Sequence, residues 1–128
     1  MSTTFEGLRP GLRNEIETTV TEPMVTRHVG GSGVLTTPHM IGLMEDAAGD
    51  AMAPRLPEGY TTVGYEVCIK HRAATALGMR VRVTAELLEV DGRKLLFRVE
   101  ARNDHALIGD GTHRRTIVRV GFLGNPNQ

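Results

Sequence analysis

The residues of this chain most able to do chemistry together are a threonine, a carboxylate and an imidazole: Thr37, Glu45 and His71. A carboxylate attacks a carbonyl carbon or activates water, an imidazole moves protons near neutral pH, and a hydroxyl orients either group. On a helical wheel Glu45 falls beside Ile41 and Met52, at the margin of an apolar stripe. Partial removal from water makes a carboxylate there a better base or nucleophile, although the position also suits a solvated helix residue.

Thr37 and His71 occupy the ends of predicted elements. Thr37 precedes Pro38, so we expect the threonine to be the N-cap of a helix that has proline in its first position. The backbone N–H groups that follow a helix start can hold a developing oxyanion. His71 closes a strand next to a loop, where it either transfers protons or is an ordinary surface histidine. His39 opens the helix, and we expect it to line an entrance to the site.

Spacing disfavours several other kinds of site. The histidines have no HxH or HExxH arrangement and Cys68 is the only cysteine, so we expect no metal ion. No GxSxG nucleophile motif is present. The glycine-rich stretch 29–33 is interpreted as a flexible loop, because no strand–GxGxxG–helix order surrounds it. Cys68 lies in the strand-like run 67–69 and is predicted to be a small core residue.

One long helix and about five strands are predicted to position these residues. Apolar residues have helical spacing from Thr37 to about Arg55, where Pro54 and Pro57 end the helix. Apolar and polar residues alternate over 15–25, 63–69, 79–87, 95–101 and 117–120, and Asp91-Gly92 indicates a hairpin. Half-buried strands need a cover, which one central helix can supply. The pattern therefore predicts an α+β fold with a curved antiparallel sheet around the helix.

Length and composition predict a single domain over 1–128, with 1–13 as a loose N-terminal lead-in. The chain has 128 residues, 40% of them hydrophobic, which suffices for one core. Fifteen basic and fifteen acidic side chains cancel, so a nucleic-acid partner is disfavoured. Arg114, Arg115 and Arg119 alternate with apolar residues and are interpreted as the wet face of a strand. No stretch approaches the ~18 apolar residues of a membrane span, and we expect a cytoplasmic protein with no membrane partner.

Five segments carry a resemblance to a known family: MIGLME at 40–45, AMAP at 51–54, VCIKHRAAT at 67–75, VTAEL at 83–87 and IGDGTH at 108–113. In order and spacing they resemble the fluoroacetyl-CoA thioesterase family of hotdog-fold hydrolases. The resemblance runs from about Thr37 to Val120. It implies the hotdog fold, hydrolysis of an acyl-CoA without a cofactor, and a homodimer in which the sheets of two subunits continue into each other.

The resemblance also implies roles for individual residues. The family has a threonine, glutamate and histidine catalytic set, which falls on Thr37, Glu45 and His71. A glycine that helps hold the thioester carbonyl falls on Gly64. An arginine falls on Arg115, which would contact the phosphates of coenzyme A or pair with a carboxylate at the dimer interface. Two courses stay open for Glu45: direct attack on the thioester, or activation of a water molecule.

One departure from the family bears on the substrate. Family members selective for a fluorinated acyl group resemble one another in carrying aromatic residues around the catalytic threonine, and the stretches 31–36 and 38–39 have no Phe, Tyr or Trp. We therefore expect a short- or medium-chain acyl-CoA as substrate. Two alternatives remain: an acyl-thioester hydratase or dehydratase that uses His71 with Glu45, and a non-catalytic acyl-CoA binding protein. Whether dimers pair further into tetramers also stays open.

Overall fold

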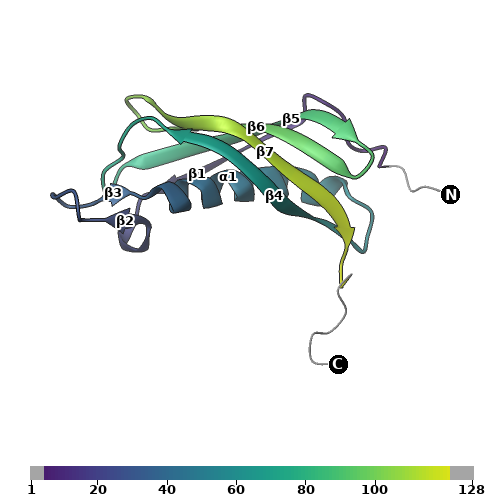
Figure 1. Cartoon of the computed structure of the whole chain (residues 1–128), viewed down its shortest axis with the longest axis horizontal. Coiled ribbons are helices and arrows are strands. Elements are labelled where there is room, and N and C mark those ends of the chain that lie inside the picture. The colour runs from purple at the N-terminus through teal and green to yellow at the C-terminus, as the bar shows by residue number, and fades with distance from the viewer. Residues whose placement is uncertain (1–4, 122–128) are drawn as a thin grey trace.

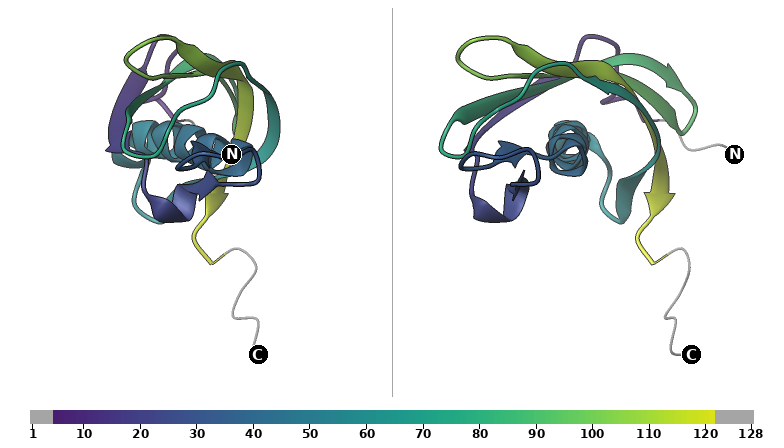
Figure 2. Two further views of the ribbon diagram at one scale, coloured as in Figure 1. Left: turned by 90° about the vertical axis from the view of Figure 1, so that its left-hand side faces the viewer. Right: turned by 60° about the vertical axis from the view of Figure 1, so that its left-hand side comes forward.

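Residues 5–121 are described by the computed structural model of the chain, and they form an antiparallel sheet around one long helix. The elements are β1 (Arg13–Thr19), η1 (Glu22–Met24), β2 (Val25–Thr26), β3 (Val34–Leu35), α1 (Thr37–Met52), η2 (Ala53–Arg55), β4 (Tyr60–His71), β5 (Arg80–Asp91), β6 (Lys94–Arg102) and β7 (Leu107–Arg119). Five strands make the sheet in the order β1-β5-β6-β7-β4, and β2 and β3 pair separately. Figures 1 and 2 show the sheet curving over α1. The predicted α+β hotdog arrangement is confirmed.

The core lies between the inner face of the sheet and α1. Alternate residues of β5 and β6 point inward and are buried: Val81, Val83, Ala85, Leu87, Leu95, Phe97, Val99 and Ala101. The helix adds Met40, Met44, Ala47, Ala48, Ala51 and Met52. The predicted turn between these strands is present, with Gly92 at a φ of 59°, a left-handed conformation that favours glycine. No helix within residues 5–121 has the length and hydropathy to cross a membrane.

The beginning of α1 corrects the predicted cap. Thr36, not Thr37, is the N-cap: its hydroxyl accepts a hydrogen bond from the His39 backbone N–H at 3.3 Å. Thr37 is the first helical residue and Pro38 the second, where a missing N–H is still tolerated. Two adjacent threonines suit a cap equally well, so local sequence did not distinguish them. The consequence is chemical, because the Thr37 hydroxyl is not used to cap the helix.

The N-terminal segment also differs from expectation. The strand expected over 15–25 is split, because Pro23 lies in the short helix η1 between β1 and β2. Residues 1–4 of the expected lead-in lie outside the described residues. Two of its described residues, Phe5 and Leu8, are buried in the core, and the Phe5 ring lies edge-on to Tyr60, 5.4 Å between centroids.

Strand β4 is one outer edge of the sheet, and it exposes apolar side chains. Val63, Tyr65 and Val67 are 39%, 48% and 42% exposed. A β-bulge shifts the pairing with β7 between Gly64 and Glu66. Cys68 is also exposed, which corrects its prediction as a core residue. A long edge strand with exposed apolar residues is the kind of surface that pairs with another chain.

Candidate active site

Thr37 and His71 meet where the beginning of α1 lies beside the end of β4. The Thr37 hydroxyl and His71 Nδ1 share a hydrogen bond of 2.8 Å. His71 Nε2 is buried and has no hydrogen-bond partner among the described residues. A buried polar atom without a partner costs about 1–3 kcal/mol, so its persistence points to a functional use. We call these residues the Thr37–His71 pair.

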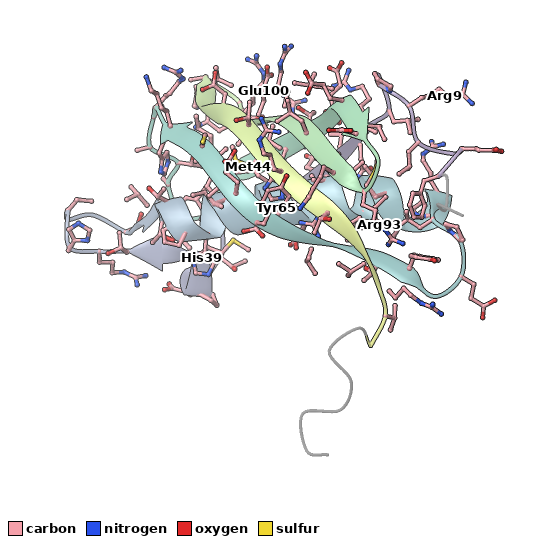
Figure 3. The ribbon with its side chains drawn as sticks, turned by 45° about the vertical axis from the view of Figure 1, so that its right-hand side comes forward. Arg9, His39, Met44, Tyr65, Arg93 and Glu100 are labelled. Carbon is pink, nitrogen blue, oxygen red and sulfur yellow. The ribbon has the colours of Figure 1, made fainter. Side chains whose placement is uncertain are left out.

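A pocket of about 640 Å³ opens beside this pair, and both residues line it. The apolar part of the lining consists of Pro23, Val25, Val29, Val34, Leu35 and Pro38. In the described chain no Phe, Tyr or Trp lines this pocket. His39 also lines it, with its Nδ1 2.9 Å from the Thr36 hydroxyl. Figure 3 shows the His39 side chain near the start of α1. The pair therefore has an apolar cavity next to its polar atoms, which is the arrangement that small-molecule sites use.

Glu45 lies farther along α1, half-buried over Gly64 of β4. A Cβ at position 64 would lie 3.1 Å from Glu45 Oε2 and 2.7 Å from Cε1 of His113. Only glycine therefore leaves room for the carboxylate and the imidazole to converge on β4. The structure brings Glu45 and Gly64 together. A catalytic carboxylate and a glycine that holds the substrate carbonyl would have to be this close.

Arg115 is buried in the same place, at 9% exposed, and each of its three guanidinium nitrogens has a hydrogen-bond partner. Nε donates to the Thr62 hydroxyl at 2.8 Å, Nη2 to the Thr62 carbonyl at 2.9 Å, and Nη1 contacts His113 Nε2 at 3.2 Å. No carboxylate lies within 4.0 Å of it in the described part of the chain. The wet-face interpretation of Arg115 is wrong, whereas Arg114 does lie on the outer face, paired with Glu66. We call Glu45, Thr62, Gly64, His113 and Arg115 the Glu45 cluster.

Electrostatics in the Glu45 cluster reflect its burial. Burial lowers the pKa of Arg115, and the carboxylates of Glu45, Asp46 and Asp50 act in the opposite direction. Burial also lowers the pKa of His113; the Glu66 carbonyl raises it, Arg115 lowers it and Glu45 raises it. His113 is therefore neutral near pH 7 in the folded chain.

Within one chain the three predicted catalytic residues form two groups. Thr37 and His71 are joined, but Glu45 is eight residues farther along the helix, a rise of about 12 Å. Because the helix is rigid, this rise keeps Thr37 and Glu45 apart. A single subunit therefore does not let Thr37 orient the Glu45 carboxylate.

Thr62 and His113 take part in the site although sequence reasoning gave them no role. Their signal was present in the strand register, because residues paired across strands share a face. His113 and Arg115 alternate along β7 with buried Ile117, and Thr62 pairs with Ile117, so all of these side chains lie on the inner face toward α1. Among residues 5–121 no group of three or more His, Cys, Asp or Glu side chains is arranged to hold a metal ion.

Comparison with known proteins relates the chain to thioesterases. The fluoroacetyl-CoA-specific thioesterase family model matches residues 17–120. A fluoroacetyl-CoA thioesterase from Streptantibioticus cattleyicolor is 46% identical over 87 residues, which cover 68% of this chain and 63% of that protein. The match thus spans a little less than two thirds of that relative's length.

Solved structures agree in fold over nearly the whole chain. A mutant of a fluoroacetyl-CoA-specific thioesterase in complex with fluoroacetate and CoA is 37% identical, with a TM-score of 0.84 over 91% of this chain and 100% of that one. A thioesterase superfamily member from Thermus thermophilus is 33% identical, with a TM-score of 0.81 over 90% and 87% of the two chains.

Proposed function

Because the chain belongs to the fluoroacetyl-CoA-specific thioesterase family, we propose that it hydrolyses an acyl-CoA thioester to a free acid and coenzyme A. The observation that carries the proposal is the half-buried Glu45 carboxylate over Gly64, which forms no ion pair within 4.0 Å among residues 5–121. Gly64 lies beside a β-bulge, where the regular ladder of hydrogen bonds is interrupted. We assign its N–H to the thioester carbonyl oxygen.

Two courses for the carboxylate satisfy the chemistry. In the first, Glu45 attacks the carbonyl carbon, the thiolate leaves, and water hydrolyses the resulting anhydride. In the second, Glu45 removes a proton from a water molecule that attacks the same carbon. In both courses the leaving thiolate takes up a proton, and the buried His71 Nε2, oriented by Thr37 through Nδ1, is the group we assign to that transfer.

We further propose that a complete site needs two subunits. Thr37 lies by His71 and Glu45 lies by Gly64, so α1 and β4 run in opposite directions, with one chemical group at the start of α1 and the other near its middle. A two-fold axis at the β4 edge would pair this strand antiparallel with its copy. The Gly64 end of one strand would then lie beside the His71 end of the other, bringing Glu45 of one subunit to the Thr37–His71 pair of its partner.

Exposed apolar side chains along the β4 edge support this homodimer. Its apolar residues Val63, Tyr65 and Val67 would be removed from water by the pairing, which adds about 25 cal/mol for each Å² of apolar surface buried. A second copy is the occupant with the matching strand edge. The exposed Cys68 thiol has no disulfide partner among the described residues, which supports our proposal of a reducing, cytoplasmic location.

We propose the pocket of about 640 Å³ beside the Thr37–His71 pair as the acyl site. Its lining is aliphatic apart from His28, His39, His71 and three threonines, and it has room for more than a two-carbon acid. A short- or medium-chain acyl group is therefore the expected substrate, in preference to fluoroacetyl.

The test is thiol release from a series of acyl-CoA chain lengths. Glu45→Gln should lose about 100-fold or more of kcat, the range expected for a positioned acid–base or nucleophilic group. Glu58→Gln, the same substitution at an exposed glutamate before β4, is the matched control and should keep its activity. Enoyl absorbance changes without thiol release would show a hydratase instead. Binding of acyl-CoA with neither product would show a non-catalytic binding protein.

A further inference from the structure

His113 is held in one protonation state and one tautomer by its two neighbours. It is 1% exposed, with Nδ1 2.8 Å from the Glu66 carbonyl oxygen and Nε2 3.2 Å from Arg115 Nη1. A carbonyl only accepts, so Nδ1 must carry the proton and donate. A guanidinium only donates, so Nε2 must be bare and accept. Both bonds exist together only in the neutral Nδ1–H imidazole.

Arg115 is in turn fixed by three bonds, all of which restrain the same planar group. Two go to Thr62 and one to His113 Nε2. The guanidinium also lies against α1, with Nη2 3.3 Å from where a Cβ of Gly49 would be. Three carboxylates of this helix, Glu45, Asp46 and Asp50, attract its charge.

The three bonds have a consequence for Glu45. A free arginine beside a carboxylate forms a direct, often bidentate, ion pair, which would occupy the oxygens of Glu45. Arg115 and Glu45 line the same small pocket of about 330 Å³, but no ion pair within 4.0 Å joins them in the described chain. The carboxylate thus feels a nearby positive charge while its oxygens stay open toward Gly64.

We propose that His113 is a positioning residue for Glu45, which acts by accepting a hydrogen bond from Arg115 and so holds the guanidinium near the carboxylate without pairing with it. The His113 ring also lies beside the Glu45 carboxylate, since its Cε1 lies over Gly64. This role rests on the proposed hydrolase function for its effect on rate, but the tautomer of His113 is independent of that function.

The tautomer is tested by ¹⁵N NMR of histidine-labelled protein at about pH 7.5, where the two ring nitrogens of a neutral imidazole give separate shifts. The His113 signals are assigned by their loss in His113→Gln. We expect protonated Nδ1 and bare Nε2. The opposite tautomer, a cation, or fast exchange between tautomers would overturn the proposal. A wild-type protein that hydrolyses no acyl-CoA would defeat the proposed function and leave this measurement valid.

The positioning role is tested by kinetics on matched variants. His113→Leu removes the acceptor and should lower kcat about 10-fold or more with KM changed less than about 3-fold. His113→Gln keeps an acceptor and should recover most of kcat. In an Arg115→Lys background His113→Leu should have little further effect, because the two residues act as one unit. His105→Gln, in an exposed turn, is the control histidine substitution.

Several outcomes would contradict this role. Additive losses from His113→Leu and Arg115→Lys would show that His113 does not act through Arg115. An unchanged kcat in His113→Leu would show that no positioning is needed. If His113→Leu does not fold, as judged by thermal unfolding, His113→Phe, which keeps a ring but has no acceptor, replaces it in the same comparison with Arg115→Lys and with the double variant.

Discussion

The hydroxyl of Thr37 and Nδ1 of His71 lie 2.8 Å apart, although 34 positions separate them along the chain. This bond fixes the imidazole ring from one side and directs Nε2 into a buried place where it has no partner among the described residues. A histidine held through one nitrogen and open at the other is arranged for proton transfer, because the first bond sets the orientation of the ring.

Removal of the Thr37 hydroxyl should lower the rate of thioester hydrolysis. Thr37→Val keeps the shape of the side chain but leaves His71 Nδ1 without its partner, so kcat should fall by about 10- to 100-fold. Thr37→Ser retains the hydroxyl and should remain within about 3-fold of wild type. Steady-state kinetics with one acyl-CoA measure both. Equal losses in the two variants would show that the methyl group matters and not the hydrogen bond.

Mixed dimers should show whether Glu45 acts across the subunit interface. Glu45→Gln and His71→Ala homodimers should both be nearly inactive. After random re-association in equal amounts, half of the dimers are mixed and each mixed dimer has one intact site. Activity should then recover to about a quarter of the wild-type rate per chain.

The same mixture has a different outcome if each site is built from one chain. In that case every site of a mixed dimer carries one substitution, and no activity returns. Subunit exchange is verified separately with a mass-tagged chain and native mass spectrometry, so that failure to exchange is not mistaken for failure to complement.

A charge on the β4 edge should separate the subunits and abolish activity together. Val67 is 42% exposed on this edge, and Val67→Glu would place two like charges near a two-fold axis. Val120→Glu is the control, because Val120 is 67% exposed but follows the end of β7. Light scattering should give a dimer for wild type and Val120→Glu and a monomer for Val67→Glu. An active monomer would refute the two-subunit site.

The lowered pKa of His113 makes folding stability depend on pH in a specific direction. Burial keeps the folded pKa below the ordinary value of 6.5, so the unfolded chain takes up a proton first as the pH falls. The contribution of His113 to the free energy of unfolding is complete above about pH 6.5. It is lost as the pH falls from there through the lowered folded pKa, and below that pKa the free energy no longer changes because of His113.

Denaturant unfolding at a series of pH values measures this contribution. His113→Gln should flatten the loss of unfolding free energy below the ordinary histidine pKa, relative to wild type, because glutamine does not titrate. His105→Gln should keep the wild-type slope, since that side chain is exposed. An identical slope in wild type and His113→Gln would show that His113 titrates alike in the folded and unfolded chains.

Local sequence patterns were sufficient for most of the fold. Alternation predicted β5 and β6, and the apolar stripe predicted α1. Burial on one face makes apolar residues recur with the period of the strand or helix. The predicted N-cap of the helix was one residue too late, because Thr36 and Thr37 have the same capping chemistry. Cys68 was misplaced because the average burial of a free cysteine does not describe an edge strand, and edges are set by tertiary pairing.

The candidate site was less accessible to sequence reasoning. The contact of Thr37 with His71 joins two elements, and only the three-dimensional arrangement shows that Glu45 lies apart from it. Alternation predicted that Arg115 faces water, because it assumes that polar strand residues do so, and His113 was given no role. Beside the polar flank of α1 the inner face of β7 is itself polar, so the same alternation has the opposite meaning there.

The proposed acyl pocket predicts how chain length should be selected. Val34 is half-buried and lines the pocket beside the Thr37–His71 pair, so Val34→Phe would fill part of its volume of about 640 Å³. Each methylene in an apolar pocket is worth roughly 10-fold or more in kcat/KM, so the longer acyl groups should lose most. Acetyl-CoA, which occupies less of the pocket, should keep its kcat/KM within about 3-fold.

The measurement is kcat/KM for straight-chain acyl-CoA substrates with wild type, Val34→Phe and a Val120→Phe control that lies away from the pocket. The optimum chain length should shift downward only in Val34→Phe. The same loss for every chain length would mean that Val34→Phe disturbs Thr37 or His71 and not the acyl site. An unchanged optimum would place the acyl group elsewhere, with the cavity between Met24 and Leu43 on the outer side of α1 as the next position to substitute.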